Sequence, residues 1–217
     1  YTYSEPTVFF ELVEDTARLA LTQGLKNVLV TNGFMSPDCL AAFGPDSRGK
    51  PGLIQAANVD LKAFTEGFYQ ERCGARLAPV LDNLRHMRAL GWWLEITTLL
   101  IPGLNDDPGE LARLAAFIAS ELGPDTPWHL SRFHPDYKLT DRPVTPHETL
   151  LAARAVGWGA GLRYVYIGNA SGPGFGDTVC PACKAVMLGR DGFRVVTAGL
   201  ADGACTFCGA AIAGVWA

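Results

Sequence analysis

The sequence lacks any long uninterrupted hydrophobic run and any excess of basic residues. Its most apolar stretch, GWWLEITTLLIPG, is broken by Glu95 and Pro102, so no segment is suited to spanning a bilayer. Lys and Arg number 18 against 22 Asp and Glu, so the electrostatic attraction that favours nucleic acid or an anionic membrane is missing. The opening residues, YTYSEP, contain neither an initiator Met nor the regions of a secretory signal. We therefore expect a cytoplasmic protein.

Cysteine is also scarce, with six residues in 217, but four of the six form two C-x-x-C pairs. Cys180 and Cys183 lie in CPAC, Cys205 and Cys208 lie in CTFCG, and 21 residues separate the pairs. This spacing is typical of four thiolates arranged tetrahedrally around one Zn²⁺ ion. The intervening VMLGRDGFRVV predicts a hairpin of short strands, as in a zinc ribbon. A rubredoxin-like iron site and an unmetallated redox pair are the alternatives.

The first 168 residues alternate short β-rich runs with helical patterns. The predicted strands are NVLVTNG, ANVDLK, WWLEITTLLIPG, WHLSRFH and RYVYIGN. Helices are predicted over 7–23, 77–90, 107–122 and from 145 to about 157, the last two opening on capping boxes at Asp107 and Thr145. This order predicts a parallel sheet with right-handed crossovers. Residues 169–177, rich in Gly, Ser and Pro, predict a linker, and residues 178–217 a separate small module.

The predicted strands end on polar side chains. These residues are Glu5, Thr31, Asn32, Asp60, Lys62 and His134. Each alone has a structural explanation, such as a surface ion pair for Asp60 and Lys62 or a turn at Asn32. Their recurrence at successive strand ends, where α/β barrels place their chemistry, predicts a site. An acid, a Lys, an amide and an imidazole are the partners that an amino-acid-bearing nucleotide needs.

Several motifs in order resemble one enzyme family. YTYSEP, VLVTNG, NVDLKAF, CGARLAPVLDNL, LEITTLLIPGLND, SRFHPDYKLTD and YVYIGN, followed by the C-x-x-C pairs, resemble the radical S-adenosylmethionine (SAM) enzymes of the AmmeMemoRadiSam system, relatives of the pyruvate formate-lyase activating enzymes. The resemblance implies a partial (β/α)6 barrel over residues 1–168. It also implies a [4Fe-4S] cluster that cleaves SAM reductively to a 5′-deoxyadenosyl radical, which abstracts hydrogen from a substrate.

The resemblance also assigns cofactor contacts. The family's Gly-Gly-Glu motif, which meets the methionyl amino group at the end of the second strand, corresponds to Tyr3, Ser4 and Glu5, so both glycines are replaced here. Asp60 and Lys62 match the Asp-Leu-Lys stretch near the cofactor's carboxylate. His134, in SRFHPDY, matches a family histidine near the ribose. The expected SAM-binding set is Tyr3, Ser4, Glu5, Thr31, Asn32, Asp60, Lys62 and His134.

The three cluster cysteines of the family are missing from this sequence. Cys39 and Cys73 cannot replace them, because three ligands at C-x-x-x-C-x-x-C spacing must converge from one loop; lone cysteines are usually small core residues. We expect the [4Fe-4S] ligands upstream of Tyr1, on a chain truncated before its first strand. The alternative is a degenerate barrel without radical chemistry. As it stands, this chain should not cleave SAM.

Two further functional alternatives remain open. A glycyl-radical-enzyme activase is the first, and a barrel scaffold whose zinc ribbon binds protein or nucleic acid is the second. The ribbon favours a macromolecular target, although its net charge of +1 gives little affinity for phosphates. The family implies a reductant such as ferredoxin or flavodoxin, and Memo-like and AMME-type domain proteins, as partners. The substrate cannot be read from the sequence.

Overall fold

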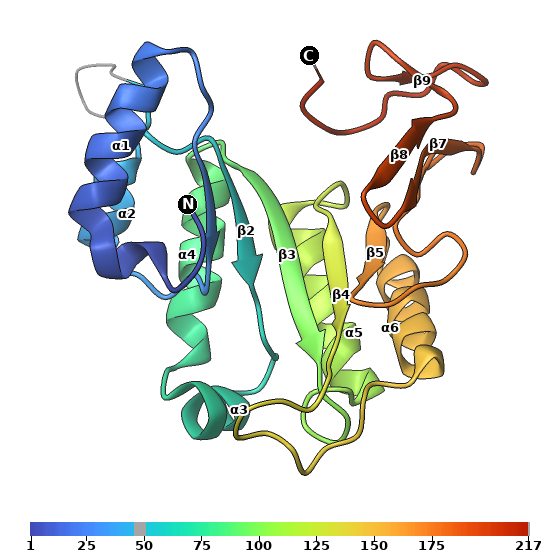
Figure 1. The fold of residues 1–217 in the computed structure, drawn as a ribbon, viewed down its shortest axis with the longest axis horizontal. Coiled ribbons are helices and arrows are strands. Elements are labelled where there is room, and N and C mark those ends of the chain that lie inside the picture. Colours follow the sequence, from blue (N-terminus) through green and yellow to red (C-terminus); the bar gives the residue numbers. More distant parts are fainter. Residues whose placement is uncertain (46–50, 217) are drawn as a thin grey trace. The chain divides into compact units, whose positions relative to one another are not determined.

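Five strands form the principal sheet, in the spatial order β1-β2-β3-β4-β5 (Figure 1). The computed structural model describes residues 1–45 and 51–216. The pairs β1–β2, β2–β3 and β4–β5 are parallel, as the strand and helix alternation predicts. The strands are β1 (Val28–Thr31), β2 (Ala56–Asp60), β3 (Trp93–Leu100), β4 (Trp128–Arg132) and β5 (Val165–Gly168).

Helices connect these strands. They are η1 (Pro6–Phe9), α1 (Phe10–Thr22), α2 (Pro37–Phe43), α3 (Glu66–Phe68) with η2 (Tyr69–Cys73), α4 (Leu77–Ala89), α5 (Pro108–Phe117) with η3 (Ile118–Leu122), and α6 (His147–Gly159). No helix in the described ranges has both the length and the apolar character that crossing a membrane requires. The chain divides into two compact units, Tyr1–Thr98 and Leu99–Ala217.

In the first unit the strands bury every second side chain. Leu29, Val59 and Ile96 are fully buried, whereas their neighbours point to the opposite face and are half-buried or exposed. We call that second face the open face; in the first unit it carries Val28, Val30, Ala56, Asn58, Asp60, Trp93, Glu95 and Thr97. In a barrel wall, the buried face packs against the surrounding helices and the other face points to the barrel interior.

The first helix differs from its prediction. A 3₁₀ turn occupies Pro6–Phe9, so the α-helix begins at Phe10 and buries Val13 and Ala17. Leu12, which the sequence pattern places on the core face, is 66% exposed. The turn shifts the buried face by about one residue, because each residue rotates a helix by roughly 100°.

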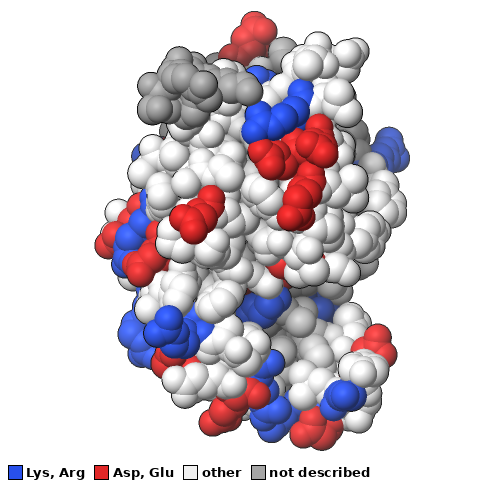
Figure 2. Space-filling model, turned by 90° about the vertical axis from the view of Figure 1, so that its left-hand side faces the viewer, with Lys and Arg blue, Asp and Glu red and all other residues white. Residues whose placement is uncertain are grey.

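Surface charge on the first unit is mixed. On the face drawn in Figure 2, acidic and basic side chains lie in small groups of both signs, and pairs such as Arg18 with Glu14 and Arg85 with Asp82 are in contact. Charges of both signs are therefore interspersed on that face.

In the second unit α6 lies very close to β4 and β5. A Cβ added at Gly157 would stand 3.0 Å from both Trp128 and Val165, so any larger residue there requires these side chains to shift by a few tenths of an ångström. Asp107 caps α5 as predicted, accepting a hydrogen bond of 2.8 Å from the Glu110 N–H. The predicted capping box at Thr145 is wrong, because the Thr145 hydroxyl donates to the Leu100 carbonyl at 2.6 Å instead.

The C-terminal module consists of short antiparallel strands. A three-stranded sheet has the order β6 (Thr178–Val179), β7 (Val186–Asp191) and β8 (Arg194–Thr197), and β9 (Leu200–Ala201) pairs with β10 (Ala204–Cys205). The β7–β8 hairpin is the one predicted from VMLGRDGFRVV. The buried core of the module is small: Tyr164, Cys180, Met187, Cys205 and Ile212.

Candidate functional site

The Glu5 carboxylate binds the end of β1. Its Oε1 accepts a hydrogen bond of 2.7 Å from the Thr31 hydroxyl, and its Oε2 accepts one of 2.8 Å from the Asn32 N–H. Thr7 adds two longer contacts from its N–H and hydroxyl, at 3.4 and 3.2 Å. Both carboxylate oxygens are therefore already hydrogen-bonded, so Glu5 fixes the chain entering η1 to the strand end.

Tyr3 and Ser4 adopt left-handed backbone conformations, with φ of 59° and 58°. This region favours glycine, because a Cβ approaches the following carbonyl there. These are the two positions that the sequence resemblance aligns with glycines.

Glu5 does not end a strand, contrary to the sequence prediction. It caps the 3₁₀ turn η1, and residues 2–5 are not extended sheet. Only Tyr1 pairs with the edge of β1: its amino group donates to the Val28 carbonyl at 2.7 Å, and its carbonyl accepts from the Val30 N–H at 2.9 Å. This is the bonding pattern of a parallel ladder. The left-handed turn at Tyr3 and Ser4 then ends the ladder.

Asp60 and Lys62 form an ion pair at the end of β2. The Lys62 Nζ lies 2.9 Å from Asp60 Oδ2, and the two side chains are 41% and 38% exposed. The Lys62 N–H also donates to the Tyr69 hydroxyl at 3.2 Å. Burial raises the pKa of Tyr69, against a lowering by that backbone bond, so the phenol stays protonated at neutral pH. Half-exposed ends leave both charges accessible to a ligand.

Strand register brings these two groups to adjacent positions. Thr31 is the register partner of Val59, and Asp60 that of Thr97, so the Glu5 group and the Asp60–Lys62 pair follow neighbouring strands at the same edge of the sheet. The sequence prediction of one polar rim over β1 and β2 is therefore consistent with the topology. The side-chain oxygen of Asn32 accepts a hydrogen bond of 2.7 Å from the Phe34 N–H, which forms a local turn.

Sequence reasoning missed Asn58 and Thr97 on the open face. The Thr97 hydroxyl donates to Asn58 Oδ1 at 2.8 Å across the β2–β3 pair. Both residues are half-buried and belong to the same row of side chains as Asp60. Polar residues at every second position of ANVD and LEITTL were the signal that could have identified them.

His134 belongs to the second unit. It lies two residues after β4, is exposed, and its Nε2 stands 3.5 Å from the Asn169 carbonyl. Asn169 has φ of 54° and donates from its side chain to the Ser131 hydroxyl at 2.9 Å. The predicted position after a strand end is thus correct.

Cys39 and Cys73 are both half-buried in the first unit. Burial, and then the charge of Glu5, raise the pKa of Cys39 to about 11. Burial also raises the pKa of Cys73, against a lowering by Lys62. Both thiols are therefore protonated at neutral pH. Among the described residues, neither belongs to a group of three or more potential metal ligands.

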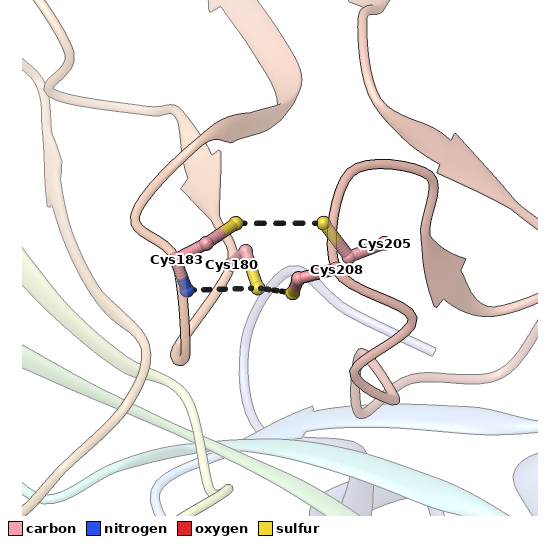
Figure 3. Close-up of side chains that lie close together, drawn as sticks. All are labelled: Cys180, Cys183, Cys205 and Cys208. Carbon is pink, nitrogen blue, oxygen red and sulfur yellow. Dashed lines mark hydrogen bonds between the residues drawn. The ribbon is translucent and has the colours of Figure 1, made fainter.

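The four paired cysteines converge as predicted. Their sulfurs all lie within 4.8 Å of one another. The Sγ atoms of Cys180 and Cys208 are 3.6 Å apart, as are those of Cys183 and Cys205. The loop with Cys180 and Cys183 thus faces the loop with Cys205 and Cys208 (Figure 3). This is the arrangement of four thiolates around one tetrahedral ion, and the donor set fits Zn²⁺.

Backbone N–H groups lower the pKa of two of these thiols, Cys180 and Cys208. N–H groups of Cys183 and then Ala182 lower the pKa of Cys180 to about 6. The Ala210 N–H lowers the pKa of Cys208, but hydrogen bonds to the Cys183 and Cys180 sulfurs favour its protonated form and raise the pKa to about 12 overall. Four thiolates this close repel one another, so a divalent cation is what would allow all four to ionise.

One curated protein is similar to this chain in sequence. No protein-family model matches the chain. Over 211 residues it is 41% identical to the uncharacterised protein MJ0808 of Methanocaldococcus jannaschii, an alignment that covers 96% of this chain. The chain spans 60% of the length of that curated relative.

Solved structures similar to the chain are radical SAM proteins. A domain of a pyruvate-formate lyase-activating enzyme from Bacteroides vulgatus matches with a TM-score of 0.63 and 20% identity, over 78% of this chain and 97% of that domain. A radical SAM methyltransferase from Sphaerobacter thermophilus gives 0.58 and 14%, over 75% and 48%. Streptococcus suis SuiB gives 0.57 and 12%, over 78% and 38%. The chain therefore has the fold of a partial radical SAM barrel, followed by a four-cysteine module.

Proposed function

We propose that this chain is the SAM-binding part of a radical SAM enzyme of the AmmeMemoRadiSam type. The observation that carries the proposal is the partial radical SAM barrel with a carboxylate-anchored left-handed turn and an accessible Asp60–Lys62 pair at adjacent strand ends. When bound and reduced, SAM supplies a 5′-deoxyadenosyl radical for hydrogen abstraction from a substrate.

The residues present fit the methionine end of SAM. The Tyr3 and Ser4 carbonyls, which lie in the left-handed turn, accept from its amino group. Glu5 acts through the backbone, because its own oxygens hold Thr31 and Asn32 in place. The Lys62 ammonium pairs with the SAM carboxylate, and Asp60 orients that ammonium at 2.9 Å. The side-chain amide of Asn32 serves the ribose hydroxyls.

The residues present do not fit a [4Fe-4S] cluster. In the described part of the chain, the four C-terminal cysteines are the sole group with metal-ligand geometry, and they enclose their site. The proposal needs a C-x-x-x-C-x-x-C loop elsewhere in the protein, upstream of Tyr1.

A glycyl-radical-enzyme activase is a narrower form of the same proposal. It is favoured by the likeness to a domain of a pyruvate-formate lyase-activating enzyme. The four-cysteine module favours a macromolecular target over a small metabolite, because such modules commonly form contact surfaces. Ferredoxin or flavodoxin as reductant, and Memo-like and AMME-type proteins as partners, belong to the proposal.

The test uses the protein with its upstream segment, reconstituted anaerobically with iron and sulfide. We expect one [4Fe-4S] cluster per chain and release of 5′-deoxyadenosine from SAM after reduction. Lys62→Ala should weaken SAM binding at least about tenfold, because a charge-assisted contact contributes roughly 1.5–3 kcal/mol. Lys26→Ala, an exposed lysine before β1, is the matched control.

Two results would contradict different parts of this proposal. A protein that forms the cluster but releases no 5′-deoxyadenosine is not a radical SAM enzyme. A protein that is active but binds SAM equally well after Lys62→Ala has its cofactor elsewhere than the end of β2.

A further inference from the structure

His129 and Tyr166 form a ring pair on the open face of β4 and β5. They are register partners, and their rings stack with centroids 5.2 Å apart and an interplanar angle of 24°. Their chain neighbours Trp128 and Val165 point the other way, against Gly157 of α6. The two rings therefore lie on the strand face opposite to the helix.

Tyr166 is held from the C-terminal module. Its hydroxyl lies 3.0 Å from the Thr178 hydroxyl, and the Arg190 guanidinium donates to that same Thr178 oxygen at 2.7 Å. The Arg190 guanidinium carbon also stands 5.8 Å from the Tyr166 ring centroid, within the range of a cation–π contact. Tyr166 is thus in contact with His129 on one strand and with Arg190 from the module.

Arg190 is itself fixed by three bonds. Its backbone N–H donates to Asp177 Oδ1 at 2.8 Å. In the side chain, one guanidinium nitrogen donates both to the Gly176 carbonyl at 2.8 Å and to the Thr178 hydroxyl at 2.7 Å. A planar guanidinium held this way has little rotamer freedom left. Its position therefore depends on the end of the linker, Gly176 and Asp177, and on Thr178 and β7 of the module.

The module and β5 share a core as well. Tyr164, two residues before Tyr166 and so on the same strand face, is buried beside Cys180, Met187 and Cys205. Its hydroxyl accepts the Ala213 N–H at 3.0 Å. The four-cysteine module is consequently packed against Tyr166 of β5 and against Tyr164, which lies just before that strand.

We infer that Arg190 is a positioning residue that fixes Tyr166 and, through the ring stack, the orientation of His129 on the open face. The four-cysteine module then has a role beyond stabilising the end of the chain, because it sets the orientation of an imidazole on a barrel strand. That His129 faces bound substrate or cofactor rests on the proposed function; the positioning itself does not.

The test is NMR of the histidine ring protons in the zinc-loaded 217-residue chain. The sequence has four histidines, so single His→Gln variants assign every signal. Stacking on a tyrosine gives His129 ring protons an upfield ring-current shift. Arg190→Ala should abolish part of that shift and broaden the signals, while Arg190→Lys, which keeps the charge, should restore some of it.

Controls separate positioning from unfolding. Arg194→Ala, an exposed arginine on the adjacent β8, should leave His129 unchanged, and zinc content should stay at one per chain in each variant. Should Arg190→Ala lose zinc, Tyr166→Phe, which removes only the hydroxyl that meets Thr178, gives the same test. His86, on α4 in the first unit, is the internal reference.

Unchanged His129 signals in both Arg190→Ala and Tyr166→Phe would overturn the inference. So would zinc removal that leaves the His129 signals in place. None of these NMR measurements uses SAM. A negative NMR result therefore does not contradict the proposed function, and a lack of SAM cleavage does not contradict the positioning role of Arg190.

Discussion

The strands of the barrel and those of the four-cysteine module are stabilised differently. In β3 every second residue is buried, with Ile96 and Leu100 fully inaccessible. In β8 all four residues are exposed, and two of the five buried residues in the module's core are cysteines. Apolar burial thus stabilises the barrel, whereas the module has too little of it and depends on its sulfur ligands.

Removing one sulfur should have the largest effect. Cys205→Ser leaves three thiolates and is expected to abolish zinc binding, because apparent zinc binding contributes on the order of 10 kcal/mol to such modules. Metal analysis and protease resistance of residues 178–216 would measure this. Cys39→Ser should keep one zinc per chain. Full zinc content in Cys205→Ser would exclude a four-thiolate site.

Truncating the barrel core should have the next largest effect. Leu114 on α5 is fully buried, and Leu114→Ala should lower the free energy of unfolding by about 2–5 kcal/mol. The matched change in the module, Val195→Ala at a 56% exposed position, should stay within about 0.5 kcal/mol. Urea denaturation followed by circular dichroism compares the two. Equal losses would mean that β8 is buried in solution.

Relieving the left-handed turn should stabilise the first unit slightly. Ser4→Gly is expected to raise the free energy of unfolding by about 0.5–1 kcal/mol, because φ of 58° costs a residue with a Cβ. Ser171→Gly, at an exposed position without positive φ, should bring no gain. Thermal melts of both variants provide the measurement, and a destabilised Ser4→Gly would contradict the left-handed assignment.

Alkaline pH should have the smallest effect, through Cys39. Its pKa is raised from 9.0 to about 11 in the fold, so the contribution to stability is present below pH 9 and is lost as the pH rises toward 11. The urea midpoint of the parent should therefore fall more steeply over this window than that of Cys39→Ser. Parallel curves would show that Cys39 is not buried beside Glu5.

Much of the fold followed from local patterns. Runs such as NVLVTN and ANVD end on polar residues, and Asp107 with Pro108 marks a helix start by its own chemistry. The C-x-x-C pairs predicted their convergence, because four ligands of one type at ribbon spacing have one common geometry.

What could not be predicted depends on contacts distant in the chain. The Thr145 hydroxyl has a local capping role available but bonds Leu100, 45 positions away. Glu5 looks like a strand end until its carboxylate meets Thr31 and Asn32, which decides that the chain turns there. The contact of Arg190 with Tyr166 leaves no periodicity or spacing in the sequence.

The close approach of α6 to the sheet has a consequence for laboratory evolution. Helix propensity alone favours alanine over glycine by about 1 kcal/mol, so a propensity-guided library would offer Gly157→Ala as an improvement. The added methyl group would meet Trp128 and Val165 at 3.0 Å. Selections for thermostability should therefore accept this change only where Trp128 and Val165 shift by a few tenths of an ångström, or where position 128 or 165 becomes smaller at the same time.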